Sequence, residues 1–74
     1  MMVRYVIHDT RGHIRHVESD LTPDQLKVAL VNFKTQCAID GSVYEYNHFK
    51  NWLKVNKGEK LSEIGTVELE RIDM

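Results

Sequence analysis

The sequence predicts a single small α+β domain, in which an N-terminal antiparallel β-hairpin and a C-terminal strand form one sheet packed against two helices. Three observations support this fold class. The chain has 74 residues, which suits one hydrophobic core. It begins with two segments rich in β-branched residues. Its middle carries the sequence signature of a helix N-terminus. The expected order is β-β-α-(β)-α-β, and no linker or repeat divides residues 1–74.

The hairpin is expected to join residues 2–8 to residues 13–18. The intervening Asp9–Gly12 segment suits a type I turn with glycine in the left-handed position. A three-residue turn fixes the pairing of the two strands. The expected partners are Arg4–Glu18, Tyr5–Val17, Val6–His16, Ile7–Arg15 and His8–Ile14.

This pairing gives the hairpin two different faces, because successive side chains in a strand point to opposite sides. The more apolar face is expected to meet the core and carries Val3, Tyr5, Ile7 and Val17. The other face combines two aliphatic residues with two histidines and an expected ion pair: Val6, Ile14, His8, His16 and Arg4–Glu18.

The first helix has the most specific local signal in the chain. Thr22 is expected to be its N-cap, Pro23 occupies the first helical position, and Gln25 completes a capping box. Gly41 provides a C-terminal stop, so the helix should span about residues 23–39.

Helical spacing places apolar residues on two sides of this helix. The stripe expected to face the core is Leu26, Leu30, Phe33 and Cys37. The opposite side carries Val28, Val31, Thr35 and Ile39. Because a small domain usually presents charged residues there, the second apolar side is the least expected feature of the helix.

Residues 42–58 allow two interpretations. Ser42–Glu45 imitates a capping box, whereas Val43–Tyr46 is rich in residues that favour strands. We favour an extended Val43–Tyr46, followed by Asn47 as N-cap and a helix over about residues 48–56. The inward-facing residues of that helix are expected to be Phe49, Trp52 and Leu53.

The last element is expected to be a half-buried strand over residues 66–72. Apolar and acidic residues alternate there, which is the period of a strand with one covered face. Val67 and Leu69 are expected to face inward, and Glu68 and Glu70 outward.

The sequence carries no recognisable catalytic motif, so we expect a protein that is not an enzyme and has no cofactor. His8 and His16 should share one sheet face, but a zinc site normally needs three or four protein ligands, and we expect no metal. Cys37 lies on the core stripe, where a thiol behaves as a small buried hydrophobe.

The expected compartment is the cytoplasm. A lone cysteine cannot form an internal disulfide, which suggests a reducing environment. Arg4, His8 and Asp9 interrupt the first apolar stretch, so we expect no signal peptide. The longest aliphatic run, Val28–Val31, is far shorter than the roughly 20 residues of a membrane-spanning helix.

Two apolar features that the expected core does not use predict a protein-interaction module. We expect a non-enzymatic accessory regulator or inhibitor that binds a larger protein, or a homodimer that pairs with a second copy. In size and architecture the chain resembles short accessory proteins of bacteria and their phages, which often act in this way. The candidate interface residues are Val28, Val31, Thr35, Ile39, Val6 and Ile14.

The alternative is a nucleic-acid-binding module, because lysines near aromatic residues suit single-strand binding. The candidate contacts are Lys50, Lys54, Lys57, Tyr44 and Tyr46. The net charge of −1 weighs against this alternative, since nucleic-acid-binding domains are usually basic. However, residues 1–58 carry +2 and residues 59–74 carry −3, so a basic patch can coexist with an acidic tail.

Overall fold

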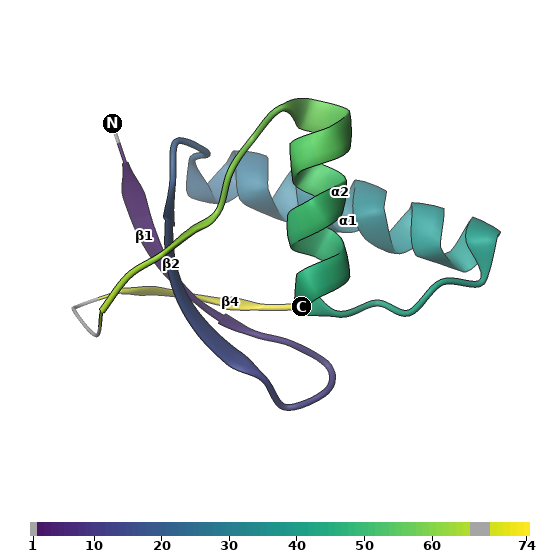
Figure 1. The fold of residues 1–74 in the computed structure, drawn as a ribbon, viewed down its shortest axis with the longest axis horizontal. Helices are drawn as coiled ribbons and strands as arrows, with labels where there is room; N and C mark the ends of the chain where they lie inside the picture. Colours follow the sequence, from purple (N-terminus) through teal and green to yellow (C-terminus); the bar gives the residue numbers. More distant parts are fainter. Residues whose placement is uncertain (1, 66–68) are drawn as a thin grey trace.

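The computed structural model describes residues 2–65 and 69–74 and shows a small α+β domain with a mixed sheet and two helices (Figure 1). The predicted hairpin, two helices and C-terminal strand are all present. The elements are β1 (Val3–His8), β2 (Ile14–Ser19), α1 (Pro23–Asp40), α2 (Tyr46–Lys57), β3 (Ser62–Glu63) and β4 (Glu70–Asp73).

The sheet has the strand order β3-β2-β1-β4, so β3 and β4 lie at its edges. β1 pairs antiparallel with β2 and parallel with β4. The predicted hairpin register is confirmed, from Arg4 opposite Glu18 to His8 opposite Ile14. Gly12 has a φ of 83°, the left-handed conformation that the predicted turn requires.

Both helices cover the same face of the sheet, and the hydrophobic core lies between the helices and this face. The sheet contributes Tyr5, Ile7, Val17 and Ile72 to this core. The predicted stripe of α1 is buried as expected, and Phe33 lies at the centre of an aromatic cluster. Its ring centroid is 5.3 Å from that of Phe49 and 5.6 Å from that of Trp52, both on α2. These contacts fix where α2 crosses α1 (Figure 1).

The predicted start of α1 is confirmed. The Thr22 hydroxyl accepts a hydrogen bond from the Gln25 backbone N–H at 3.2 Å, and the Gln25 side chain accepts one from the Thr22 N–H at 2.9 Å. This capping box satisfies two N–H groups that otherwise lack partners at a helix N-terminus. Gly41 caps the other end, and α1 runs to Asp40.

The prediction for the segment before α2 was wrong. The structure shows no strand at residues 42–45, and α2 begins at Tyr46 with Glu45, not Asn47, at the N-cap position. The physical reason is a tertiary contact. The Asp9 carboxylate in the hairpin turn accepts a hydrogen bond from the Tyr46 N–H at 3.1 Å, so a distant residue satisfies the start of the helix.

The inward face of the last strand also differs from the prediction. β4 begins at Glu70, and its buried residue is Ile72, whereas Leu69 is only half-buried. Ile72 lies opposite Ile7, which belongs to the core face of β1, and this pairing decides which residues of β4 point inward. The predicted positions 66–68 lie outside the described residues. The two-residue strand β3 was not predicted.

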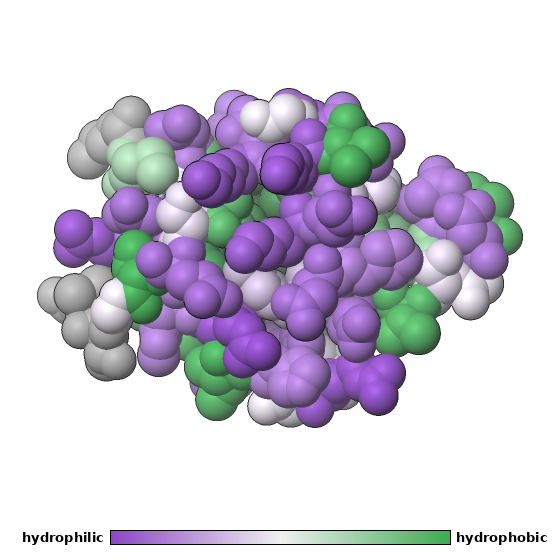
Figure 2. All heavy atoms as spheres, in the orientation of Figure 1, coloured by the Kyte–Doolittle hydropathy of each residue, from purple (hydrophilic) through white to green (hydrophobic). Residues whose placement is uncertain are grey.

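The surface is mostly polar. Figure 2 shows one face of the molecule, on which hydrophilic side chains predominate and hydrophobic ones form small separate groups. Among the described residues, no helix is both long and apolar enough to cross a membrane.

Candidate functional site

The second apolar side of α1 is exposed in the structure. Val28, Val31 and Ile39 expose 60%, 65% and 73% of their surface, and Thr35 is exposed between them. The Thr35 hydroxyl donates a hydrogen bond to the Val31 carbonyl at 3.0 Å, so this polar group is satisfied within the helix. α2 therefore does not cover this side, and we call these residues the exposed face of α1.

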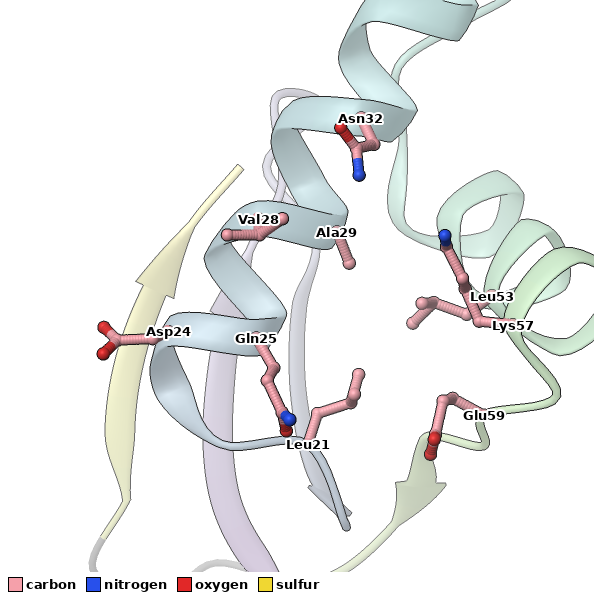
Figure 3. Close-up of a pocket in the computed structure, with 9 residues that line it drawn as sticks. All are labelled: Leu21, Asp24, Gln25, Val28, Ala29, Asn32, Leu53, Lys57 and Glu59. Atoms are coloured by element: carbon pink, nitrogen blue, oxygen red, sulfur yellow. The ribbon is translucent and has the colours of Figure 1, made fainter.

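A groove lies between α1 and α2 beside Val28 (Figure 3). Its volume is about 420 Å³, and apolar side chains from three segments line it: Leu21, Ala29 and Leu53. The remaining lining residues are Asp24, Gln25, Val28, Asn32, Lys57 and Glu59. The small methyl group of Ala29 faces Leu53 across the groove, and this leaves space between the two helices (Figure 3). We call this feature the α1–α2 groove.

The chemistry of the α1–α2 groove suits an apolar side chain. Its volume falls within the range of about 300–1,000 Å³ typical of ligand sites. The described lining residues also include two carboxylates, Asp24 and Glu59, and one ammonium, Lys57, although the Asp24 carboxylate points away from Leu53 (Figure 3). An apolar side chain that enters the groove would gain favourable free energy by burial against Leu21, Ala29 and Leu53. The charged groups would orient the bound molecule.

A second groove lies on the other flank of α1, between this helix and β4. Its volume is about 520 Å³, and it is bordered by Val31 of the exposed face. Basic, acidic and apolar groups share this α1–β4 groove: Lys27, Lys34, Arg71, Asp73, Leu30, Ile72 and Met74. The Lys34 ammonium lies 5.8 Å from the ring centroid of Tyr44, which also lines the groove. Lys34 and Tyr44 thus form a cation–π contact.

The two parts of the predicted interface lie on different sides of the molecule. α1 covers the core face of the sheet, whereas Val6 and Ile14 belong to the opposite face. Ile14 is 51% exposed and Val6 is half-buried, and His8 and His16 lie beside them as predicted. A single flat partner surface therefore cannot contact the exposed face of α1 and the Val6–Ile14 pair together.

The predicted nucleic-acid contacts are also separated. Lys50 and Lys54 line a groove of about 460 Å³ together with Lys60, which sequence reasoning missed. Lys57 points to the α1–α2 groove instead. The turn at Gly58 reverses the chain and brings Lys60 back beside α2, and that glycine is the sequence signal that could have indicated it.

Tyr46 was wrongly predicted as a surface contact, since only 1% of its surface is exposed. It begins α2, and the docking of that helix end on the hairpin turn places its ring in the core. Tyr44 is half-buried and packs on Phe33 with a centroid distance of 5.5 Å. The two tyrosines therefore do not form a platform for stacking bases.

Asp9 organises the junction between the hairpin turn and α2. One carboxylate oxygen accepts hydrogen bonds from the backbone N–H groups of Arg11 and His13, both at 2.9 Å. The other accepts from the Tyr46 N–H and lies 3.2 Å from the His13 ring Nδ1. Burial acts to raise the pKa of Asp9, but these hydrogen bonds outweigh it and hold the pKa below its ordinary value. Asp9 is therefore a structural carboxylate.

Two further contacts strengthen this junction. The Thr10 hydroxyl donates a hydrogen bond to the Tyr44 carbonyl at 2.6 Å, and the Arg11 guanidinium lies 3.6 Å from the Glu45 carboxylate. Three consecutive turn residues thus contact the two residues before α2 and its first residue, Tyr46.

The remaining reactive groups of the described residues do not assemble into a metal site. In residues 2–65 and 69–74, no three histidine, cysteine or acidic side chains are placed to hold a metal ion. Cys37 is buried, and its thiol lies 3.8 Å from the Val43 carbonyl. Burial raises the pKa of this thiol, and nearby Asp40 raises it further, so the nucleophilic thiolate is disfavoured.

No protein-family model, curated protein or solved structure matches the chain. Its function is therefore inferred from its own surfaces.

Proposed function

We propose that the protein is a non-enzymatic protein-interaction module, which binds a larger protein as an accessory regulator or inhibitor. One observation carries the proposal. Val28, on the exposed face of α1, borders the α1–α2 groove with its apolar residues Leu21, Ala29 and Leu53. A convex apolar side chain next to an apolar groove matches the central part of a protein interface, where a few well-packed contacts supply most of the affinity.

The energetic argument depends on apolar burial. Covering an exposed valine stabilises a complex by about 1.5–3 kcal/mol when burial is complete. A partner side chain that enters the groove gains a comparable amount against Leu53 and Ala29. Because association also has a large entropic cost, Val28 and the groove must act together to give a stable complex.

The charges around the groove suggest the chemistry of the partner. Of the described residues that line the groove, Asp24 and Glu59 are acidic and Lys57 is basic. We expect the partner to present an apolar anchor flanked by a basic residue, since that residue can lie opposite the Glu59 carboxylate.

The test is affinity capture of the tagged protein from an extract of the cells that express it, with and without nuclease. Val28→Asp introduces a charge beside the groove. Val55→Asp is the matched control, because Val55 is an exposed helical valine outside both grooves of α1. We expect wild type and Val55→Asp to retain the same nuclease-resistant partner and Val28→Asp to lose it. Equal retention by all three contradicts the proposed surface.

A second candidate function is nucleic-acid binding, favoured by the groove that Lys50, Lys54 and Lys60 share. Its affinity for a single-stranded probe should fall steeply with salt, because phosphate contacts release counterions. The absence of a probe shift at low salt excludes this candidate. A shift that is lost in Lys54→Glu, with partner capture unaffected by Val28→Asp, supports it over the leading proposal.

A further inference from the structure

The outer edge of β4 faces none of the strands in the part of the chain that the structure describes. β4 ends the strand order, and none of the described strands pairs with its outer side. The Met74 N–H donates to the His8 carbonyl at 2.9 Å, and Ile72 lies opposite Ile7. Alternate residues of a parallel strand bond to its neighbour, so the backbone groups of Ile72 and Met74 point to β1. Those of Arg71 and Asp73 therefore point outward.

We propose that a second copy of this chain pairs with this edge, antiparallel and about a two-fold axis. Ile72 lies at the axis opposite Ile72 of the second copy, and Arg71 lies opposite Asp73 of the second copy. In this register the outward N–H and C=O groups of Arg71 and Asp73 bond to those of the second copy. The two sheets become one continuous sheet.

The charges of Arg71 and Asp73 favour this register over other registers in which the same outward backbone groups would form hydrogen bonds. A two-fold axis centred on Arg71 would place two guanidinium groups opposite each other. An axis centred on Asp73 would place two carboxylates opposite each other. Directly opposed like charges destabilise a strand pair, whereas opposite charges stabilise it. Only the axis at Ile72 pairs each Arg71 with an Asp73.

The same two side chains already form an ion pair within one chain. The Arg71 Nε donates to the Asp73 carboxylate at 3.0 Å, and both side chains are more than half exposed. Pairing two copies adds the second carboxylate opposite each guanidinium, so positive and negative groups alternate around the axis. Charges usually protect an edge strand from pairing. In β4 the charges of Arg71 and Asp73 have opposite signs, so the edge of one copy is complementary in charge to the edge of a second copy.

The core side of the edge offers apolar surface for the contact. Val31, which is 65% exposed, lines the α1–β4 groove together with Ile72. The second copy presents the same residues across the axis, so the exposed valine of each chain gains an apolar neighbour. The other sheet edge is less suitable, because β3 has only two residues. Val31 also belongs to the exposed face of α1, but the α1–α2 groove that carries the proposed function is lined by other residues, so the dimer does not depend on that function.

The test is sedimentation equilibrium of the full chain over a wide concentration range, with single and double charge reversals. Wild type should self-associate to a dimer. Arg71→Asp and Asp73→Arg each create like-charge pairs and should weaken the dimer more than about tenfold. The double variant with both substitutions restores opposite charges and should recover most of the affinity.

Arg4→Asp is the control, because it reverses an exposed charge on β1 whose ion-pair partner, Glu18, lies on β2, on the side of β1 opposite the β4 edge. It should dimerise like wild type. Circular dichroism checks that each variant is folded, which is expected because the substituted side chains are exposed. A wild type that stays monomeric throughout overturns the proposal. So does a dimer whose affinity is unchanged in both single reversals, or one that the double variant fails to restore.

Discussion

Replacing Asp9 with alanine should destabilise the protein strongly, because this carboxylate joins the hairpin turn to the start of α2. The variant leaves three backbone N–H groups without their acceptor, those of Arg11, His13 and Tyr46. The first two belong to the exposed turn and can bond to water, whereas the Tyr46 hydrogen bond is buried. A buried donor without a partner costs about 1–3 kcal/mol, and each lost turn bond adds about 0.5–1.5 kcal/mol.

The expected loss in the free energy of unfolding is therefore about 2–6 kcal/mol, a large part of the roughly 5–15 kcal/mol typical of small proteins. Asp9→Asn retains one carbonyl oxygen, so it should cost about half as much. Urea denaturation followed by the fluorescence of Trp52 measures both values. Asp20→Asn is the control, since Asp20 is exposed in the connection between β2 and α1. A loss below about 1 kcal/mol in Asp9→Ala would refute the role of this carboxylate.

The pH dependence gives an independent check on Asp9. Its pKa in the folded protein lies below the ordinary value of 3.8. The carboxylate therefore contributes its full stabilisation above about pH 4, and this contribution disappears as the pH falls through the folded-state pKa. The difference in stability between wild type and Asp9→Asn should narrow on acidification. A constant difference between about pH 7 and pH 2 would contradict this assignment.

Three other substitutions test separate parts of the fold by urea denaturation. Tyr46→Phe should be neutral or stabilise by up to about 1 kcal/mol, because the buried hydroxyl has no hydrogen-bond partner among the described residues; a clear loss would mean that it has one. Gly58→Ala should lower the free energy of unfolding by about 1–2 kcal/mol, since Gly58 has a φ of 64°. Gly65→Ala is the control and should lower it less, because Gly65 does not have a positive φ. Thr22→Ala removes the cap of α1 and should cost about 1 kcal/mol; Thr22→Ser should retain most of the stability.

The elements that sequence reasoning predicted correctly are those with local determinants. The hairpin register follows from a three-residue turn ending at Gly12, and the start of α1 follows from Thr22 and Gln25. Both signals act over a few residues, so no tertiary information is needed to interpret them.

The errors arose where distant residues decide the structure. The start of α2 depends on Asp9, which is 37 residues away from Tyr46 in the sequence. The inward face of β4 depends on its register with β1, which places Ile72 beside Ile7. Neither contact leaves a local pattern in the sequence.

Only part of the candidate site could be predicted, because the rest of it also depends on contacts between distant residues. Helical spacing alone identified Val28 and Val31 on a second apolar side of α1, and both are exposed in the structure. The two grooves beside that side could not be predicted, because they depend on where α2 and β4 pack. Lys60 was missed because it joins Lys50 only through the turn after α2.

The most direct test of the proposed function is the affinity of the purified chain for its captured partner, measured by titration calorimetry. We expect Val28→Asp to weaken binding by at least about tenfold, the effect of losing roughly one buried apolar contact. Val55→Asp should bind like wild type. Equal affinity of Val28→Asp and wild type would contradict the assignment of the exposed face of α1 and its groove as the binding surface.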